Sequence, residues 1–189
     1  MTSGQNRIRR RGWSATRCAA ATVLAAALTL AGCGTAGQGA PVAPRTMSVS
    51  SVAFSSSVLP QRYTCHGAGI NPPLEWSGAP TGTKSFALVV DDASAPITPY
   101  IYWLVFDIGP GTTDIQEDSL PTGARQALNS AGTPGYDAPC PSHSHWYRFT
   151  VYALNTSLNQ GNGASLATVL TAIASATIGR GRIAVNWQP

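Results

Sequence analysis

Three short, strongly apolar stretches constrain the fold of this chain more than any other feature of the sequence. They span residues 85–91, 100–108 and 146–155, and each is rich in Val, Ile, Phe, Tyr and Trp. Glycine, proline, aspartate or asparagine bounds them, which is typical of buried β-strands. We therefore expect a fold made mainly of β-strands.

Two weaker patterns extend this expectation. Residues 49–54 and 182–187 alternate between apolar and polar side chains, as strands with one buried face do. Long loops rich in Gly, Pro and Asn separate the strands, and we find no internal repeat. The sequence therefore predicts one β-sandwich over residues 47–189, with no second domain.

We expect one or two peripheral helices, and the sequence marks the bounds of one of them. Ser165 can cap this helix, and Gly179 is expected to end it. The apolar residues that recur on one of its faces are Leu166, Val169, Leu170 and Ile173.

The first 32 residues have the order of an export signal. Five arginines precede an acid-free apolar run at residues 19–31, which is shorter than the roughly 20 residues that a membrane-spanning helix needs. The run ends in LAGC at residues 30–33, which resembles the bacterial lipoprotein box. We expect a signal peptide over residues 1–32 and lipidation of Cys33. An ordinary secretory signal with an incidental cysteine is the alternative.

The segment after the signal reads as a tether. Residues 33–46 are rich in Gly, Ala and Pro and lack apolar periodicity, so we expect them to be flexible. Acylated Cys33 would then hold the exported domain at the outer face of the bacterial cytoplasmic membrane or in the cell envelope.

The basic character of the chain belongs to the signal. Five of the 12 basic residues lie before Cys33 and all 8 acidic residues lie after it, so the remaining chain carries a net charge of −1. A nucleic-acid-binding domain would need a clustered basic face. We therefore expect no nucleic-acid partner.

Two cysteines remain for the folded domain. Cys65 and Cys140 would lie in an oxidising compartment, where a disulfide is plausible. Separate buried thiols are the alternative, because the sequence does not show how closely the two residues approach.

Two loop regions carry motifs with specific chemistry. The first is NPPLEWSG at residues 71–78, followed by KSFALVVDD at residues 84–92. The second is GYDAPCP at residues 135–141, followed by His145 and Tyr147. Together they resemble the phosphatidylethanolamine-binding protein family, in its bacterial Raf-kinase-inhibitor-like branch.

The resemblance runs from about residue 47 to residue 187 and implies an antiparallel β-sandwich with a small anion-binding pocket. The residues that it places in the pocket are Asp92, Ser94, Tyr102, Gly135, Tyr136, Pro139, His145 and Tyr147. Imidazole and phenol groups donate hydrogen bonds to phosphate-like groups, and a nearby carboxylate can fix the imidazole tautomer. We expect a small oxyanion or a phospholipid head group as ligand, with no cofactor and no metal.

Several positions depart from the pattern of the family. Ser94 stands where the resemblance leads us to expect a second aspartate, and Tyr102 stands where we expect a histidine. Ala138 and Trp146 replace a glycine and an arginine. One imidazole in place of two predicts a weaker affinity for anions or a different preferred ligand.

Three other hypotheses compete with anion binding. The surface loops around the pocket could inhibit an exported protease or engage another protein partner. Ser94, His145 and Asp92 could form a weak hydrolase, although no nucleophile elbow is present. A zinc site could draw its ligands from Cys140, His143, His145 and His66.

The lipoprotein interpretation predicts the outcome of Cys33→Ala. Without the acyl attachment site, the protein should be uncleaved or soluble instead of stably anchored, because firm attachment needs two acyl chains or equivalent signals. Membrane fractionation and the mass of the mature protein measure this. Cys18→Ala is the matched control and should change neither. An unchanged mature mass and unchanged membrane association in Cys33→Ala would contradict the interpretation.

Overall fold

The computed structural model describes residues 45–95 and 97–189. The predicted signal peptide, the predicted lipidation site at Cys33 and the tether as far as residue 44 lie outside the described residues. Among the helices within these ranges, none has both the length and the apolar character needed to cross a membrane.

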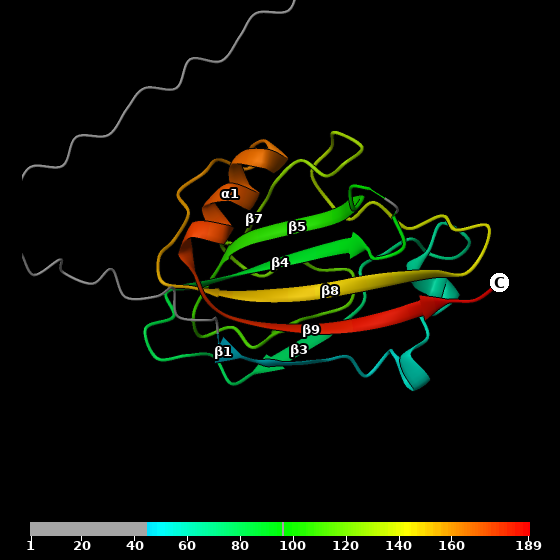
Figure 1. Ribbon diagram of the computed structural model, residues 1–189, viewed down its shortest axis with the longest axis horizontal. Coiled ribbons are helices and arrows are strands. Elements are labelled where there is room, and N and C mark those ends of the chain that lie inside the picture. Colours follow the sequence, from blue (N-terminus) through cyan, green and yellow to red (C-terminus); the bar gives the residue numbers. More distant parts are fainter. Residues whose placement is uncertain (1–44, 96) are drawn as a thin grey trace, which may run out of the picture. The chain divides into compact units, whose positions relative to one another are not determined.

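The strands form two sheets (Figure 1). The larger has six strands in the order β1-β9-β8-β4-β5-β7, and the smaller has three in the order β2-β3-β6. Neighbouring strands are antiparallel except β1 and β9, which are parallel. The strand bounds are β1 Arg45–Thr46, β2 Ser48–Ser50, β3 Leu74–Ser77, β4 Ser85–Asp92, β5 Ile101–Ile108, β6 Asp114–Ile115, β7 Arg125–Gln126, β8 His145–Leu154 and β9 Thr177–Trp187.

The predicted sandwich with a peripheral helix is confirmed. Helix α1 (Leu166–Ala176) packs on one face of the large sheet, and the small sheet covers the other face. Two short 3₁₀ turns, η1 (Ser55–Ser57) and η2 (Gln61–Tyr63), lie between β2 and β3. The three apolar stretches of the sequence become β4, β5 and β8, each within one residue of its predicted ends.

Strand β4 lies at the centre of the large sheet and is buried along its whole length. Its side chains alternate between two cores. Phe86, Leu88 and Val90 join the core between the two sheets, whereas Ala87 and Val89 join the core beneath α1. This alternation is a direct consequence of the two-residue repeat of a strand.

The predicted strand at residues 49–54 is wrong beyond its first two residues, since β2 ends at Ser50. The chain turns at Ser51, whose hydroxyl donates a hydrogen bond to the Pro73 carbonyl at 2.6 Å and accepts one from the Ala53 amide at 3.2 Å. Serine hydroxyls that bond the backbone in this way stabilise turns in competition with strands.

The predicted end of the helix is also wrong. Ser165 caps α1 as expected, because its hydroxyl accepts the Thr168 amide at 3.3 Å. The helix nevertheless ends at Ala176, and β9 begins at Thr177, before Gly179. Thr177 has extended backbone angles and donates its hydroxyl to the Ile173 carbonyl at 2.6 Å. The helix therefore passes directly into the last strand.

The two glycines of β9 allow a close approach of neighbouring segments of the chain. A Cβ atom on Gly181 would lie 2.5 Å from the Met47 carbonyl oxygen and 2.8 Å from Cγ2 of Val49. A Cβ atom on Gly179 would lie 2.7 Å from the ring of Pro80. The Met47 amide donates to the Arg180 carbonyl at 2.8 Å, so backbone pairs with backbone here.

This contact predicts the effect of Gly181→Ala. The added methyl group should lower the free energy of unfolding by about 1–3 kcal/mol, because it overpacks a site whose nearest neighbours include backbone. Gly161→Ala is the matched control, since a Cβ atom there would meet nothing within 4 Å, and it should change stability by less than about 0.5 kcal/mol. Denaturant unfolding measures both, and equal stability of the two variants would contradict the close approach.

Candidate functional site

The two aspartates at the end of β4 point to opposite faces of the large sheet. On the outer face, beside α1, the Asp91 carboxylate pairs with the guanidinium of Arg148 from β8. On the inner face, Asp92 extends the row of core residues of β4 and lies opposite Tyr147 in the strand register. Both carboxylates are buried, and buried charges need partners.

The partner of Asp92 is an imidazole. His145, the first residue of β8, places Nδ1 3.0 Å from Oδ2 of Asp92. The other carboxylate oxygen accepts the Ser94 amide at 2.7 Å. The carboxylate therefore fixes which side of the imidazole faces the core, and Nε2 points away from it. His145 is half-buried, and this second nitrogen lies 2.9 Å from Nε2 of His143, an exposed residue.

Two phenols extend the same row. The Tyr147 ring stacks on the imidazole of His145, with centroids 6.2 Å apart and planes inclined by 18°. Tyr102 of β5 meets the Tyr147 ring edge-on at 5.6 Å. Asp92, Tyr102, His145 and Tyr147 thus lie side by side, and we call these four residues the inner-face cluster.

A break in strand register brings Tyr102 to this face. Val90 pairs with Trp103, but the next residue of β4, Asp91, pairs with Ile101. Tyr102 is therefore the extra residue of a β-bulge. Consequently both Tyr102 and Trp103 pack against the core between the sheets, although neighbours in a regular strand would alternate.

Burial keeps the phenols of the cluster protonated. It raises the pKa of Tyr102 to about 12, and the negative charge of Asp92 adds to this effect. Burial likewise raises the pKa of Tyr147 above its usual value. Both hydroxyls therefore remain neutral hydrogen-bond donors at physiological pH.

The loop of the second motif forms a wall beside the cluster. The Asp137 amide donates to the Tyr102 carbonyl at 2.9 Å, and the Asp137 carboxylate accepts the Tyr100 hydroxyl at 2.7 Å. Gly135 has a φ of +118°, which favours glycine. The Tyr136 hydroxyl donates to the Tyr63 carbonyl at 2.8 Å, so it links this loop to the segment around Tyr63.

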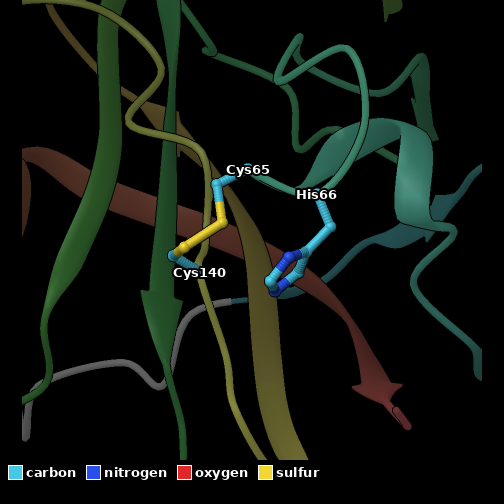
Figure 2. Close-up of side chains that lie close together, drawn as sticks. All are labelled: Cys65, His66 and Cys140. Carbon is cyan, nitrogen blue, oxygen red and sulfur yellow. A yellow bond between two sulfur atoms is a disulfide. The ribbon is translucent and has the colours of Figure 1, made fainter.

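A disulfide braces this wall. The structure joins Cys65 and Cys140, with Cα atoms 5.1 Å apart, as Figure 2 shows. The Cys65 amide donates to the Pro139 carbonyl at 2.9 Å, so backbone and covalent contacts coincide. The cross-link closes a 75-residue separation and stabilises the fold by about 4 kcal/mol in the chain-entropy model.

The alternative zinc set of Cys140, His143, His145 and His66 is not assembled among the described residues. Cys140 is bonded to Cys65 and therefore has no thiolate to offer, although His66 lies beside both sulfur atoms (Figure 2). The His66 ring instead stacks on Trp187, and its Nε2 lies 3.2 Å from the Pro141 carbonyl. His143 and His145 do come together, with their Nε2 atoms 2.9 Å apart.

The Ser94–His145–Asp92 relay of a hydrolase is not assembled either. The Ser94 hydroxyl accepts the Trp146 amide at 2.9 Å. The two nitrogens of His145 face Asp92 and His143. Ser94 therefore stabilises the turn that follows β4, and in the described part of the chain its hydroxyl has no hydrogen bond to His145.

Sequence reasoning did not place His143 or Trp187 in the anion site. The spacing of two residues between His143 and His145 was a signal for a shared site. Trp187 pairs with His145 in the strand register, and its indole nitrogen is buried with no hydrogen-bond partner among the described residues. Both side chains belong to the surroundings of the inner-face cluster.

The outer face holds a separate cavity. It has a volume of about 330 Å³ and is lined by Asp91, Arg148 and Arg182 together with apolar side chains of β4, β5 and α1. Because the large sheet lies between them, this cavity and the inner-face cluster are independent candidates for ligand binding.

Comparisons with known proteins agree with this architecture. Residues 49–188 match the family described as phosphatidylethanolamine-binding protein. A UPF0098 protein of Methanothermobacter thermautotrophicus is 42% identical over 131 residues, which are 66% of this chain and 87% of that protein. The protein named "Putative lipoprotein LppC" of Mycobacterium tuberculosis is 36% identical over 152 residues, which are 79% and 75% of the two chains.

A solved structure shares the fold. The crystal structure of E. coli YbcL, described as a new member of the mammalian PEBP family, superposes with a TM-score of 0.70 at 30% identity. The match covers 76% of this chain and 98% of that one.

Tyr63, Tyr100 and Tyr102 all have a raised pKa, and this predicts how the protein responds to alkali. A buried tyrosine with a raised pKa stabilises the fold below pH 10, the ordinary value, and this contribution is lost as the pH rises towards about 12. Phenolate absorbance should therefore rise mainly together with unfolding, which circular dichroism follows. A gradual titration of these phenols near pH 10 in the folded protein would contradict their burial.

Proposed function

Because the chain belongs to the phosphatidylethanolamine-binding protein family, we propose that the inner-face cluster binds a small phosphate-like oxyanion, such as a phospholipid head group. The observation that carries this proposal is the Asp92–His145 contact of 3.0 Å. It holds the imidazole with Nε2 directed away from the core, beside two phenols that stay protonated.

The chemistry of these groups suits an oxyanion. Protonated imidazole donates through both nitrogens, so it can bond Asp92 on one side and an anion on the other. Hydrogen bonds with a charged partner are about twice as strong as neutral ones. The buried indole N–H of Trp187, which has no hydrogen-bond partner within residues 45–95 and 97–189, would add a donor from the neighbouring strand position.

The position of His143 is compatible with this proposal. Its Nε2 faces Nε2 of His145 at 2.9 Å. His143 is exposed and lies in the loop before β8, so an anion would displace its ring at little cost in buried surface.

We further propose that the protein acts outside the cytoplasm, anchored through acylated Cys33. The support is the export signal and LAGC motif of the sequence and the name of the LppC relative. An anchored domain would meet phospholipid head groups at a high local concentration, which compensates for a modest affinity.

Calorimetric titration with phosphoethanolamine and with a simple phosphomonoester tests the site. His145→Ala should weaken binding by about tenfold or more, since a charge-assisted hydrogen bond is lost. Ser94→Ala should have a smaller effect, because the Ser94 hydroxyl bonds the Trp146 amide. Binding that is indifferent to His145→Ala would remove the proposal.

The same titration at two pH values tests the protonation state. For a ligand of fixed charge, affinity should be higher with His145 protonated than with it neutral, because only the imidazolium supplies a charge-assisted donor. His145→Gln keeps a donor without the charge and should remove the part of the pH dependence that comes from the imidazole, leaving the part due to the second ionisation of the phosphate. Tyr102→His, which adds a second imidazole, should strengthen binding at mildly acidic pH.

A further inference from the structure

The histidine pair at the start of β8 has a geometry that the anion proposal does not use. The Nε2 atoms of His143 and His145 lie 2.9 Å apart, with ring centroids 4.4 Å apart and planes inclined by 48°. A direct hydrogen bond between the rings accounts for this distance. The same distance also suits a metal ion.

The separation matches the requirement of a chelate. Imidazole nitrogens lie about 2.05 Å from a bound transition metal, so two of them at a right angle to each other are about 2.9 Å apart. Right-angled coordination by nitrogen is typical of Cu²⁺ and Ni²⁺ in tetragonal geometry. Little movement of either ring is therefore needed for an ion to replace the shared proton.

The remaining ring nitrogens are already held in place. Nδ1 of His145 lies 3.0 Å from the Asp92 carboxylate, and Nδ1 of His143 lies 3.1 Å from the Ser142 hydroxyl. Metal-binding histidines almost always bond a carboxylate, carbonyl or similar group through the nitrogen that is not coordinated. A hydroxyl can donate or accept, so Ser142 fits either tautomer of His143.

We propose that His143 and His145 chelate a divalent transition-metal ion through their Nε2 atoms, with Cu²⁺ as the preferred ion. Cu²⁺ is favoured because imidazole sites bind it most tightly among the first-row divalent ions. The buried charge of Asp92 offsets part of the positive charge of the ion. The exposed position of His143 leaves the other coordination sites open to water.

The other cluster of metal-binding side chain types among the described residues is less suitable. Cys65, His66 and Cys140 place their ligand atoms within 4.8 Å of one another. The disulfide consumes both thiolates, so that cluster offers one imidazole (Figure 2). The histidine pair needs no reduction before it can bind.

Copper titration of the full chain in detergent, without any phosphate compound, tests the proposal. Electron paramagnetic resonance of the complex should show one Cu²⁺ with two equivalent imidazole nitrogens. His143→Ala should weaken binding by at least about tenfold, whereas His66→Ala is the matched control and should bind as the parent chain does. A spectrum with a single nitrogen, or affinity indifferent to His143→Ala, would leave only a hydrogen-bonded pair and overturn the proposal.

A second measurement separates this inference from anion binding, since both use His145. Phosphoethanolamine binding is measured in the presence of a chelator, which removes metal ions. Under these conditions the anion proposal predicts that His143→Ala still binds phosphoethanolamine. In the parent chain, an absence of copper binding with anion binding intact overturns the metal site alone. The reverse result overturns the anion site alone.

Discussion

Two consecutive carboxylates lie at the end of a strand that is buried on both faces. Their need for partners constrains how β4 pairs with β8 and where the candidate site lies. The alternation of a strand sends Asp91 and Asp92 to opposite faces, and neither can remain as an unpaired charge. Strand β8 supplies a partner for each carboxylate: Arg148 pairs with Asp91 on the outer face, and His145 pairs with Asp92 on the inner face. The odd spacing between these two residues gives them opposite faces, so a change of register would break both pairs.

The two pairs have different consequences because their partners differ. A guanidinium keeps its charge at every physiological pH, so the Asp91 pair is a permanent link between β4 and β8. An imidazole has a charged and a neutral form, and the ring nitrogen facing away from Asp92 can donate or accept a hydrogen bond. The group whose charge and hydrogen-bonding role can change, the imidazole of His145, therefore lies on the inner face. Around it, the β-bulge supplies a phenol and the disulfide fixes the wall.

Much of the fold could be predicted from the sequence, because the central strands β4, β5 and β8 are apolar on both faces and stand out from their flanks. The end of α1 could not. Gly179 reads as a stop signal, yet it serves the close approach of β1 and Pro80 to β9. That role depends on tertiary contacts which local sequence does not encode.

The candidate site could be predicted in part, through the family resemblance. That resemblance places Asp92, His145 and Tyr147 in one pocket, and the structure brings the three side chains together. The side of the sheet on which Tyr102 lies depends on a bulge that no residue pattern announced. The pairing of His143 with His145, in place of a set that includes Cys140, depends on the disulfide.

The most direct test of the central claim is a titration with inorganic phosphate followed by nuclear magnetic resonance of the backbone amides. We predict saturable shifts at Tyr102, at residues 92–95 and at residues 145–147. Shifts confined to Arg148, Arg182 and the neighbouring α1 would place the anion in the outer cavity, and the absence of saturable shifts would exclude binding. Either result would contradict the account.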